Sequence, residues 1–310
     1  MQNTLVKLRE SLSAYEAREV QSIIDLLLEE VCNLSRVDRI MHPDLVLSEA
    51  QRQRLFDCAD KLSQGIPVQQ ALGYEWFCGA KFKVTPDVLI PRPETAELVT
   101  WICEENTSPV TILDIGTGSG CIALSLARLI NNSQVLAIDL STAALGVAKE
   151  NCCQQGVDNA YFAQCDILRA VDNSYFETQI NQELTTYPRG CSKQNPQELF
   201  RGYEPDKRVF NVIVSNPPYI CQQEKTEMSP VVLDHEPSLA LFVPDEDPLL
   251  FYRTIAKFGR EHLTDGGKLY FEINAAYAAE TCEMLRNLGY KEVTLRQDIN
   301  GRDRMVRAEK

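Results

Sequence analysis

The residues with the clearest chemical potential are Asn216-Pro217-Pro218-Tyr219, which follow an apolar run over residues 209–215. Such a run predicts a buried strand, and in an open α/β sheet ligands bind just beyond the carboxyl ends of the strands. Proline rings fix φ at about −65°, and a proline pushes the residue before it to extended geometry. The turn is therefore stiff, and it can hold the side-chain oxygen of Asn216 and the carbonyl oxygen of Pro217 at a fixed separation.

Two fixed acceptors suit a planar NH₂ group, and Tyr219 adds an aromatic face on which a flat group can stack. The lone pair of such a nitrogen is delocalised, so the nitrogen attacks carbon poorly. Accepting both N–H hydrogens draws electron density onto the nitrogen and aims its lone pair at an electrophile. The alternative is a loop that merely ends a strand, which is the commoner meaning of Pro-Pro. The source of the electrophile decides between the two.

A glycine-rich turn upstream predicts where that electrophile binds. A strand over 110–114 ends in Asp114, and the sequence Ile-Gly-Thr-Gly-Ser-Gly over 115–120 then leads into an apolar helix over 121–130. Its G-x-G-x-G spacing, followed by Cys121, departs from the dinucleotide fingerprint G-x-G-x-x-G and disfavours NAD and FAD. Asp114 can hold an ammonium group directly or through water, which suits the amino-acid moiety of S-adenosylmethionine. The turn residues expected to contact this cofactor are Gly116, Thr117, Gly118, Ser119 and Gly120.

Two further predicted strands also end in an aspartate. Asp139 can accept both hydroxyls of a ribose, and Asp166 can accept from an adenine amino group while Ile167 packs on the ring. Each acid could instead cap a helix, and the Ser-Thr pair at 141–142 makes that alternative real for Asp139. Three successive strands that end in Asp, with Asn216 at the end of a fourth, favour a site for S-adenosylmethionine.

This combination resembles the class I S-adenosylmethionine-dependent methyltransferases that modify planar nitrogens: adenine N6 in DNA, guanine N2 in rRNA or glutamine N5 in proteins. The four residues of the acceptor turn, 216–219, do not separate these activities. Four stretches outside the core do, and together they closely resemble the HemK/PrmC family, the N5-glutamine methyltransferases of bacterial peptide chain release factors. The stretches are Gly-Tyr-Glu-Trp-Phe (73–77), Leu-Ile-Pro-Arg-Pro-Glu-Thr (89–95), Glu-Pro-Ser-Leu-Ala-Leu-Phe (236–242) and Asn-Gly-Arg-Asp-Arg (300–304). The resemblance runs from about residue 60 to 308.

The resemblance implies methylation of the glutamine in the Gly-Gly-Gln loop of class 1 release factors. It implies that residues 116–120 and Asp139 bind the cofactor, that Ile167 lines the adenine pocket and that residues 216–219 hold the glutamine side chain. Asn216, Pro217 and Tyr219 are then the catalytic residues, Pro218 is a further substrate contact and Asn216 also touches the cofactor.

Several positions leave alternatives open or depart from the family pattern. Arg92 either orients the substrate or holds two segments together. Gln70, Ala96 and Asn274 stand where the family usually has Tyr, Glu and Gly, and we expect none of them to touch the acceptor turn.

The net charge of −13, from 44 acidic and 31 basic residues, argues against an enzyme that grips a phosphate backbone. It favours a basic protein partner. One alternative activity is a nucleic-acid exocyclic-amine methyltransferase acting on adenine N6 or guanine N2. Another is a catalytically silent subunit that binds the cofactor, against which the intact acceptor turn argues. We therefore expect a release factor as partner and no direct nucleic-acid substrate.

The order of apolar periods predicts an α/β fold, a doubly wound, Rossmann-like sheet preceded by a small all-helical N-terminal domain. The resemblance implies that this is a methyltransferase sheet with an antiparallel C-terminal edge hairpin, and the Asn-Gly turn signal at 300–301 supports that ending. Helical spacing runs from Leu5 to Leu34 and again from 48 to 62. We expect a helical domain over 1–64, a linker or short hairpin over 65–93 and the methyltransferase domain over 94–310. The helical domain is either a substrate-recognition module or a cap over the sheet.

A polar segment over 168–208 lacks a sustained apolar period and carries turn signals at 187–190 and 193–196. We expect a surface insertion there, either a lid or a tolerated loop. The 11 cysteines contain no C-x-x-C pair, so no metal is expected. The sequence has neither a signal-like N-terminus nor an apolar span long enough for a membrane, which predicts a cytoplasmic protein without a membrane partner.

Overall fold

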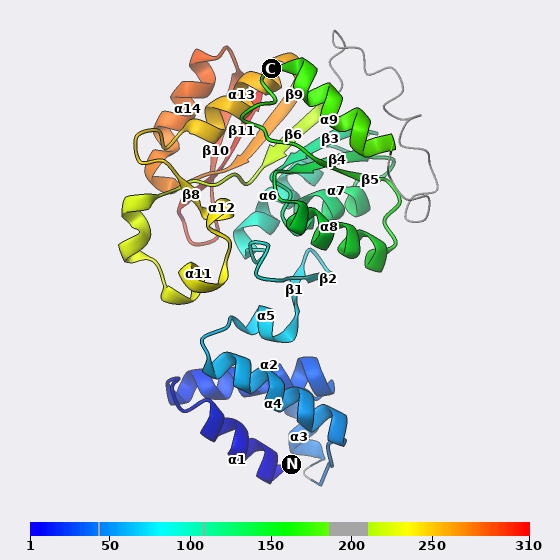
Figure 1. Ribbon diagram of the computed structural model, residues 1–310, viewed down its shortest axis with the longest axis vertical. Coiled ribbons are helices and arrows are strands. Elements are labelled where there is room, and N and C mark those ends of the chain that lie inside the picture. Colours follow the sequence, from blue (N-terminus) through cyan, green and yellow to red (C-terminus); the bar gives the residue numbers. More distant parts are fainter. Residues whose placement is uncertain (43, 108, 186–209) are drawn as a thin grey trace. The chain divides into compact units, whose positions relative to one another are not determined.

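The computed structural model describes residues 1–310 except 43, 108 and 186–209 (Figure 1). The chain forms two compact units and crosses between them several times, so the units are not simple consecutive stretches. The helical unit comprises Met1–Tyr74, Val84–Pro86 and Ser229–His235, and the sheet unit comprises Glu75–Lys83, Asp87–Met228 and Glu236–Lys310.

The helical unit is built on the five N-terminal helices together with α11 (Pro230–His235). These five are α1 (Gln2–Ser11), α2 (Ala17–Cys32), α3 (Arg36–Met41), α4 (Glu49–Ser63) and α5 (Val68–Leu72). Their apolar faces bury one leucine-rich core that includes Leu8, Leu27 and Leu55. The side chain of Gln70 donates to the carbonyl of His235 at 2.8 Å, which ties α5 to α11.

The apolar period from Leu5 to Leu34 does not form one helix, because the chain turns between α1 and α2. Two consecutive helices can then each pack against α4, and the Tyr15 hydroxyl in this turn donates to the carbonyl of Leu62 at 2.8 Å. Capping boxes at Ser35 and Ser48 begin α3 and α4, since each serine side chain accepts from a backbone N–H of the first turn.

The sheet unit contains a seven-stranded sheet in the order β10-β11-β9-β6-β3-β4-β5. Neighbours from β9 to β5 are parallel, whereas β11 pairs antiparallel with both β9 and β10. The predicted doubly wound sheet with an antiparallel C-terminal edge is therefore confirmed. The strands are β3 (Thr111–Ile115), β4 (Gln134–Asp139), β5 (Ala160–Gln164), β6 (Phe210–Ser215), β9 (Leu263–Glu272), β10 (Lys291–Gln297) and β11 (Asp303–Glu309).

Side chains alternate between the two faces of this sheet, so each face has its own core. Helices α6 (Pro93–Glu105), α7 (Cys121–Leu129) and α8 (Thr142–Gln155) pack on one face. Helices α9 (Asn173–Thr185), α13 (Leu250–His262) and α14 (Ala278–Asn287) pack on the other. Shorter elements complete the sheet unit: β1 (Tyr74–Phe77) with β2 (Ala80–Lys83), β7 (Ile220–Cys221) with β8 (Phe242–Val243), α12 (Ser238–Leu241), and the 3₁₀ turns Gln222–Glu227 and Ala275–Tyr277.

The segment over 168–208 differs from the expected insertion. Residues Asn173–Thr185 form α9, and its Phe176 and Ile180 are buried against the sheet. Phe176 also packs edge-on against Phe258 of α13, with 4.9 Å between ring centroids. The first part of the segment is therefore a crossover helix between β5 and β6, and residues 186–209 lie outside the described part of the chain.

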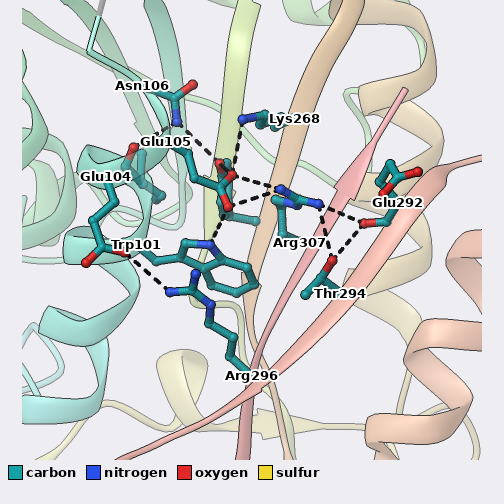
Figure 2. A network of polar contacts seen from close by, with 11 residues as sticks. Trp101, Glu104, Glu105, Asn106, Lys268, Glu292, Thr294, Arg296 and Arg307 are labelled. Carbon is teal, nitrogen blue, oxygen red and sulfur yellow. Dashed lines mark hydrogen bonds and ion pairs between the residues drawn. The ribbon is translucent and has the colours of Figure 1, made fainter.

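A polar network fixes the antiparallel edge to the rest of the sheet unit (Figure 2). Glu105, the last residue of α6, accepts from the indole N–H of Trp101 at 2.6 Å and from Arg307 of β11 at 3.0 Å. Lys268 and the hydroxyl of Tyr270, both on β9, also donate to Glu105, at 3.1 and 2.8 Å. One carboxylate thus joins a helix to two neighbouring strands.

Among the described residues, no helix combines the length and the apolar character needed to cross a membrane.

Candidate active site

A cavity of about 250 Å³ lies at the carboxyl ends of β3, β4, β5 and β6. The sheet order reverses between β3 and β6, and ligands of open α/β sheets bind at such a point. The cavity brings together most of the predicted site residues, from Arg92 to Pro218 along the sequence. Those that line it are Arg92, Gly116, Thr117, Gly118, Ser119, Asp139, Asp166, Ile167, Asn216, Pro217 and Pro218.

The glycine turn after β3 presents its backbone to the cavity. Gly116 and Gly118 have φ of +74° and +56°, and a Cβ on either would meet no protein atom within 4 Å. The backbone N–H groups of Gly116 and Thr117 both donate to the carbonyl of Ile138, at 2.9 and 3.0 Å. Main chain can therefore approach a ligand closely here without a side chain in between.

Gly120 and Asp114 do not line the cavity, which differs from the prediction. A Cβ on Gly120 would lie 3.2 Å from the Cβ of Ala148, so this glycine lets α7 pack against α8. Asp114 is fully buried; its Oδ2 accepts from the Thr117 hydroxyl at 2.7 Å and from the backbone N–H of Ala123 at 3.2 Å. Asp114 therefore holds the turn to the start of α7 from behind.

Burial raises the pKa of Asp114 to about 7, although its hydrogen bonds from Thr117 and Ala123 act in the opposite direction. The nearby charge of Asp139 also raises it. Because Asp114 is fully buried and does not line the cavity, we expect no direct contact between its carboxyl and a ligand ammonium group.

Asp139 ends β4 and lines the cavity. Its Oδ2 accepts from the backbone N–H of Gly118 at 2.8 Å, and its Oδ1 accepts from that of Ser141 at 2.9 Å. A carboxylate has about four acceptor positions, so these bonds orient Asp139 and still leave capacity for hydroxyl donors. Ser141, and not Asp139, caps helix α8, because the Ser141 side chain accepts from the backbone N–H of Ala144.

Asp166 and Ile167 follow β5 and also line the cavity. Asp166 Oδ1 accepts from the backbone N–H of Leu168 at 2.9 Å, which fixes the turn that presents Ile167. The side chain of Ile167 is 9% exposed and joins the core on the α9 face. An apolar wall next to a carboxylate suits a flat ring with one amino group.

In the acceptor turn, Asn216 connects the cavity to a buried polar chain. Its Nδ2 donates to the hydroxyl of Thr95 at 3.4 Å, and this hydroxyl donates to Glu272 Oε2 at 2.6 Å. Thr95 and Glu272 are each 2% exposed. Because the amide nitrogen faces Thr95, the amide oxygen of Asn216 remains as an acceptor.

Tyr219 lies differently from the prediction, since it does not line the cavity. Its hydroxyl donates to Glu272 Oε1 at 3.2 Å, and its ring packs against the core on the α9 face. Burial and the charge of Glu272 raise its pKa well above the usual range, so the hydroxyl stays protonated and can donate. The hydroxyl lies toward the end of β9, where its bond to Glu272 helps to fix the acceptor turn.

Asn274 corrects a second expectation, because it touches the acceptor turn. Its side-chain Nδ2 donates to the carbonyl of Tyr219 at 3.1 Å. The parallel pairing of Ser215 with Phe271 explains the contact, since it places the residues after β6 beside those after β9.

Arg92 lines the cavity and forms an ion pair of 2.5 Å with Glu236, whose side chain is 2% exposed. Burial raises the pKa of Glu236, and the charge of Arg92 opposes that rise. The pair joins the stretch before α6 to the one before α12, so the structure favours the segment-holding role for Arg92.

Thr95 and Glu272 are site residues to which the sequence analysis assigned no role, although Thr95 closes the stretch 89–95. Glu272 ends β9, and the rule that singled out Asp139 and Asp166, an acid at the carboxyl end of a strand, also applies to it. Thr95 lies in the first turn of α6 and had no such signal.

Comparison with known proteins shows which family the chain resembles. A model described as "PrmC N-terminal domain" matches residues 4–73, and one described as "Methyltransferase domain" matches residues 106–185. The "Release factor glutamine methyltransferase" of Bacteroides thetaiotaomicron is 41% identical over 302 residues, covering 97% of each chain. The protein of the same name from Flavobacterium psychrophilum is 40% identical over 300 residues, covering 95% of this chain and 93% of its own.

The chain belongs to the family of release factor glutamine methyltransferases. Among solved structures, the hMettl16 catalytic domain in complex with MAT2A 3'UTR hairpin 6 is similar with a TM-score of 0.51 at 16% identity, over 86% of this chain and 83% of that one. This second likeness concerns the fold alone.

The residues of this methyltransferase fit S-adenosylmethionine, the methyl donor of its class. The open space at Gly116 and Gly118, the spare acceptor capacity of Asp139 and the apolar wall at Ile167 match a ligand with an amino-acid end, a ribose and a flat base. They lie along one cavity that also contains Asn216.

Proposed function

We propose that this chain transfers a methyl group from S-adenosylmethionine to the side-chain nitrogen, N5, of the glutamine in the Gly-Gly-Gln motif of class 1 peptide chain release factors, and thereby tunes translation termination. The observation that carries the proposal is that the acceptor turn and the glycine turn line the same cavity. A glutamine amide held by the acceptor turn would then share the cavity with the methyl group of a cofactor held by the glycine turn.

Asn216 and Pro217 act on the acceptor. The amide oxygen of Asn216 and the carbonyl oxygen of Pro217 accept the two N–H hydrogens of the glutamine, which fixes the amide and favours its pyramidalisation. Pro218 forms the wall beside them, and Tyr219 supports the turn from behind. After transfer the nitrogen carries positive charge, so its extra proton leaves to water without a strong base.

Other residues hold the cofactor, which supplies an electrophilic methyl carbon on a sulfonium. Asp139 accepts from the ribose hydroxyls, Asp166 accepts from the adenine amino group and Ile167 packs on the ring. Gly116, Thr117, Gly118 and Ser119 carry the backbone that borders the amino-acid end. Asp114 and Gly120 act through this turn, by holding it and by letting α7 approach α8, and Asn216 borders both ligands.

The helical unit and the net charge of the chain both bear on recognition of the protein substrate. A recognition role for the five N-terminal helices fits the family to which the chain belongs, and a net charge of −13 favours a basic protein over a polyphosphate. A substrate that works on ribosomes places the reaction in the cytoplasm.

The test is transfer of labelled methyl groups by the purified full chain. The acceptors are a purified class 1 release factor, the same factor with its Gly-Gly-Gln glutamine changed to alanine, DNA and rRNA. We expect label on the first acceptor alone. Label on DNA or rRNA, or equal label on both release factors, would overturn the proposal.

A further inference from the structure

The chain of hydrogen bonds behind the acceptor turn has a fixed direction. The Thr95 hydroxyl carries a single hydrogen, and at 2.6 Å it gives that hydrogen to the carboxylate of Glu272. Toward Asn216 the hydroxyl oxygen can therefore only accept. The Asn216 amide must present its NH₂ to Thr95, because the flipped amide would place two acceptors against each other.

We propose that Thr95 and Glu272 are positioning residues that hold the Asn216 amide with its oxygen toward the reacting nitrogen. This inference rests on the proposed function, because it concerns the same site. Either orientation of an asparagine amide has nearly the same shape, so packing alone selects weakly between them. A hydrogen-bond chain that ends on a carboxylate selects strongly.

Secondary-structure elements hold the residues of this hydrogen-bond series in place. Thr95 lies in the first turn of α6, and Glu272 ends the strand next to the one that leads into Asn216. The second oxygen of Glu272 accepts from Tyr219, so both oxygens have a donor. Thr95, the partner of Asn216, and Glu272, the partner of Thr95, thus both lie in regular elements.

The direction of these hydrogen bonds depends on an ionised Glu272. Arg304 of β11 favours ionisation, while burial and the charge of Glu94 oppose it. Arg304 is itself paired with Asp298, at 3.3 Å. A neutral side chain at position 272 that donates to Thr95 would free the threonine hydrogen to point at Asn216, and the amide would turn over.

A variant series at Thr95 tests the proposal. Thr95→Val has nearly the same shape but removes the hydroxyl, and we expect kcat for methyl transfer to the release factor to fall by about 10- to 100-fold. Thr95→Ser keeps the hydroxyl and should rescue most of that loss. The matched control is Thr100→Val on the same helix, which removes an exposed hydroxyl bonded only to the helix backbone and should leave the rate unchanged.

Two further measurements separate positioning from a structural role. Affinity for S-adenosylhomocysteine, measured calorimetrically, should change less than threefold in Thr95→Val, because positioning of the acceptor leaves the cofactor contacts intact. Adding Thr95→Val to Asn216→Ala should lower the rate less than about twofold further, since Thr95 has nothing left to position.

Several outcomes would overturn the inference. One is equal rates for Thr95→Val and Thr95→Ser, and another is multiplicative loss in the double variant. Parallel loss of rate and cofactor affinity would make Thr95 a general structural residue. In all three cases the wild-type chain still methylates the release factor, whereas failure of the proposed function would show as absence of that activity in the wild type.

Discussion

Two glutamates, the partly buried Glu105 at the end of α6 and the buried Glu272 at the end of β9, have contrasting surroundings. Glu105, at the end of α6, pairs with Lys268 and Arg307 and accepts from Trp101 and Tyr270 (Figure 2). Burial alone would raise its pKa, but these donors together hold the pKa at about 2. Glu272, at the end of β9, has two neutral donors and lies in the field of Arg304, and burial raises its pKa above the ordinary range.

The difference follows from what each glutamate adjoins. The Glu105 network joins secondary-structure elements and ends in the sheet edge, so full charge pairing stabilises the fold. The Glu272 network ends on Asn216, a lining residue of the cavity, where a directed hydrogen bond matters more than charge balance. A glutamate carboxylate therefore stabilises the fold at the last residue of α6, whereas another orients a site residue at the first turn of the same helix. Proteins often accept lower stability at functional sites.

The largest effect should come from the residue where the Glu272 network meets the cavity. Asn216→Ala removes the oriented acceptor, and we expect kcat to fall by about 10²- to 10³-fold with little change in cofactor affinity or unfolding temperature. Asp139→Ala should do the reverse, with a loss of about 10- to 100-fold in cofactor affinity. Methyl-transfer kinetics and calorimetry measure the two quantities. Equal losses of rate and affinity in Asn216→Ala would mean that Asn216 serves the cofactor instead.

At the last residue of α6, the substitution Glu105→Gln should lower the stability of the fold and leave kcat unchanged. The change leaves Lys268 and Arg307 without their anion, and we expect the free energy of unfolding to fall by about 3 kcal/mol. Both tryptophans, Trp76 and Trp101, lie in the sheet unit, so urea unfolding followed by their fluorescence reports on the right region.

The matched control for this variant is Glu104→Gln, one position earlier on α6. Glu104 forms an ion pair with Arg296 at 3.5 Å, but its side chain is 59% exposed, so we expect a loss below about 1 kcal/mol. At a temperature where both variants are folded, kcat should match the wild type. A kcat loss in Glu105→Gln would contradict the division of roles between the two networks.

The pH dependence of unfolding sharpens the same comparison. The pKa of Glu105 is lowered from 4.5 to about 2 on folding, so its contribution is present above pH 4.5 and is lost as the pH falls toward 2. At 1.36 kcal/mol per pKa unit this amounts to about 3 kcal/mol. In urea titrations across this range, the stability difference between wild type and Glu105→Gln should shrink toward zero. A constant difference would show that the glutamine variant loses packing and not charge pairing.

Much of the sheet and of the cavity lining was visible in the sequence, because the period of apolar residues predicts strands and acids at strand ends predict a ligand site. The carboxyl ends of β3 to β6 meet at one edge in any doubly wound sheet, which is why Asp139, Asp166 and Asn216 come together as expected. The helix α9 was missed because, among its described side chains, the large apolar ones buried against the sheet are Phe176 and Ile180. Two such positions in a polar stretch are too few for a recognisable period.

Side-chain direction was the harder part. Proline fixes the backbone around Asn216, but the direction of Tyr219 depends on Glu272, which lies 53 positions further along the chain. Sequence separation also explains why the contact of Asn274 was not predicted. Asn274 contacts Tyr219 because β6 and β9 are neighbouring strands. Local sequence rules describe the turn, whereas its partners come from strand order.

The smallest expected effect, and the one that separates the two glutamates most clearly, is the stability of Glu272→Gln. Because the pKa of Glu272 is raised on folding, its stabilising contribution is present when it is protonated and is lost as the pH rises through the folded pKa. A neutral glutamine resembles the protonated state. We therefore expect Glu272→Gln to unfold at the same or a slightly higher urea concentration than the wild type at pH 7, although its kcat falls because Thr95 can then turn the Asn216 amide over. The stability advantage of the variant should grow as the pH rises from 4.5 through the folded pKa of Glu272, opposite in sign to the deficit of Glu105→Gln. A variant at position 272 that is both less stable and less active at pH 7 would place the two glutamates in the same structural class, and the contrast between the two ends of α6 would fail.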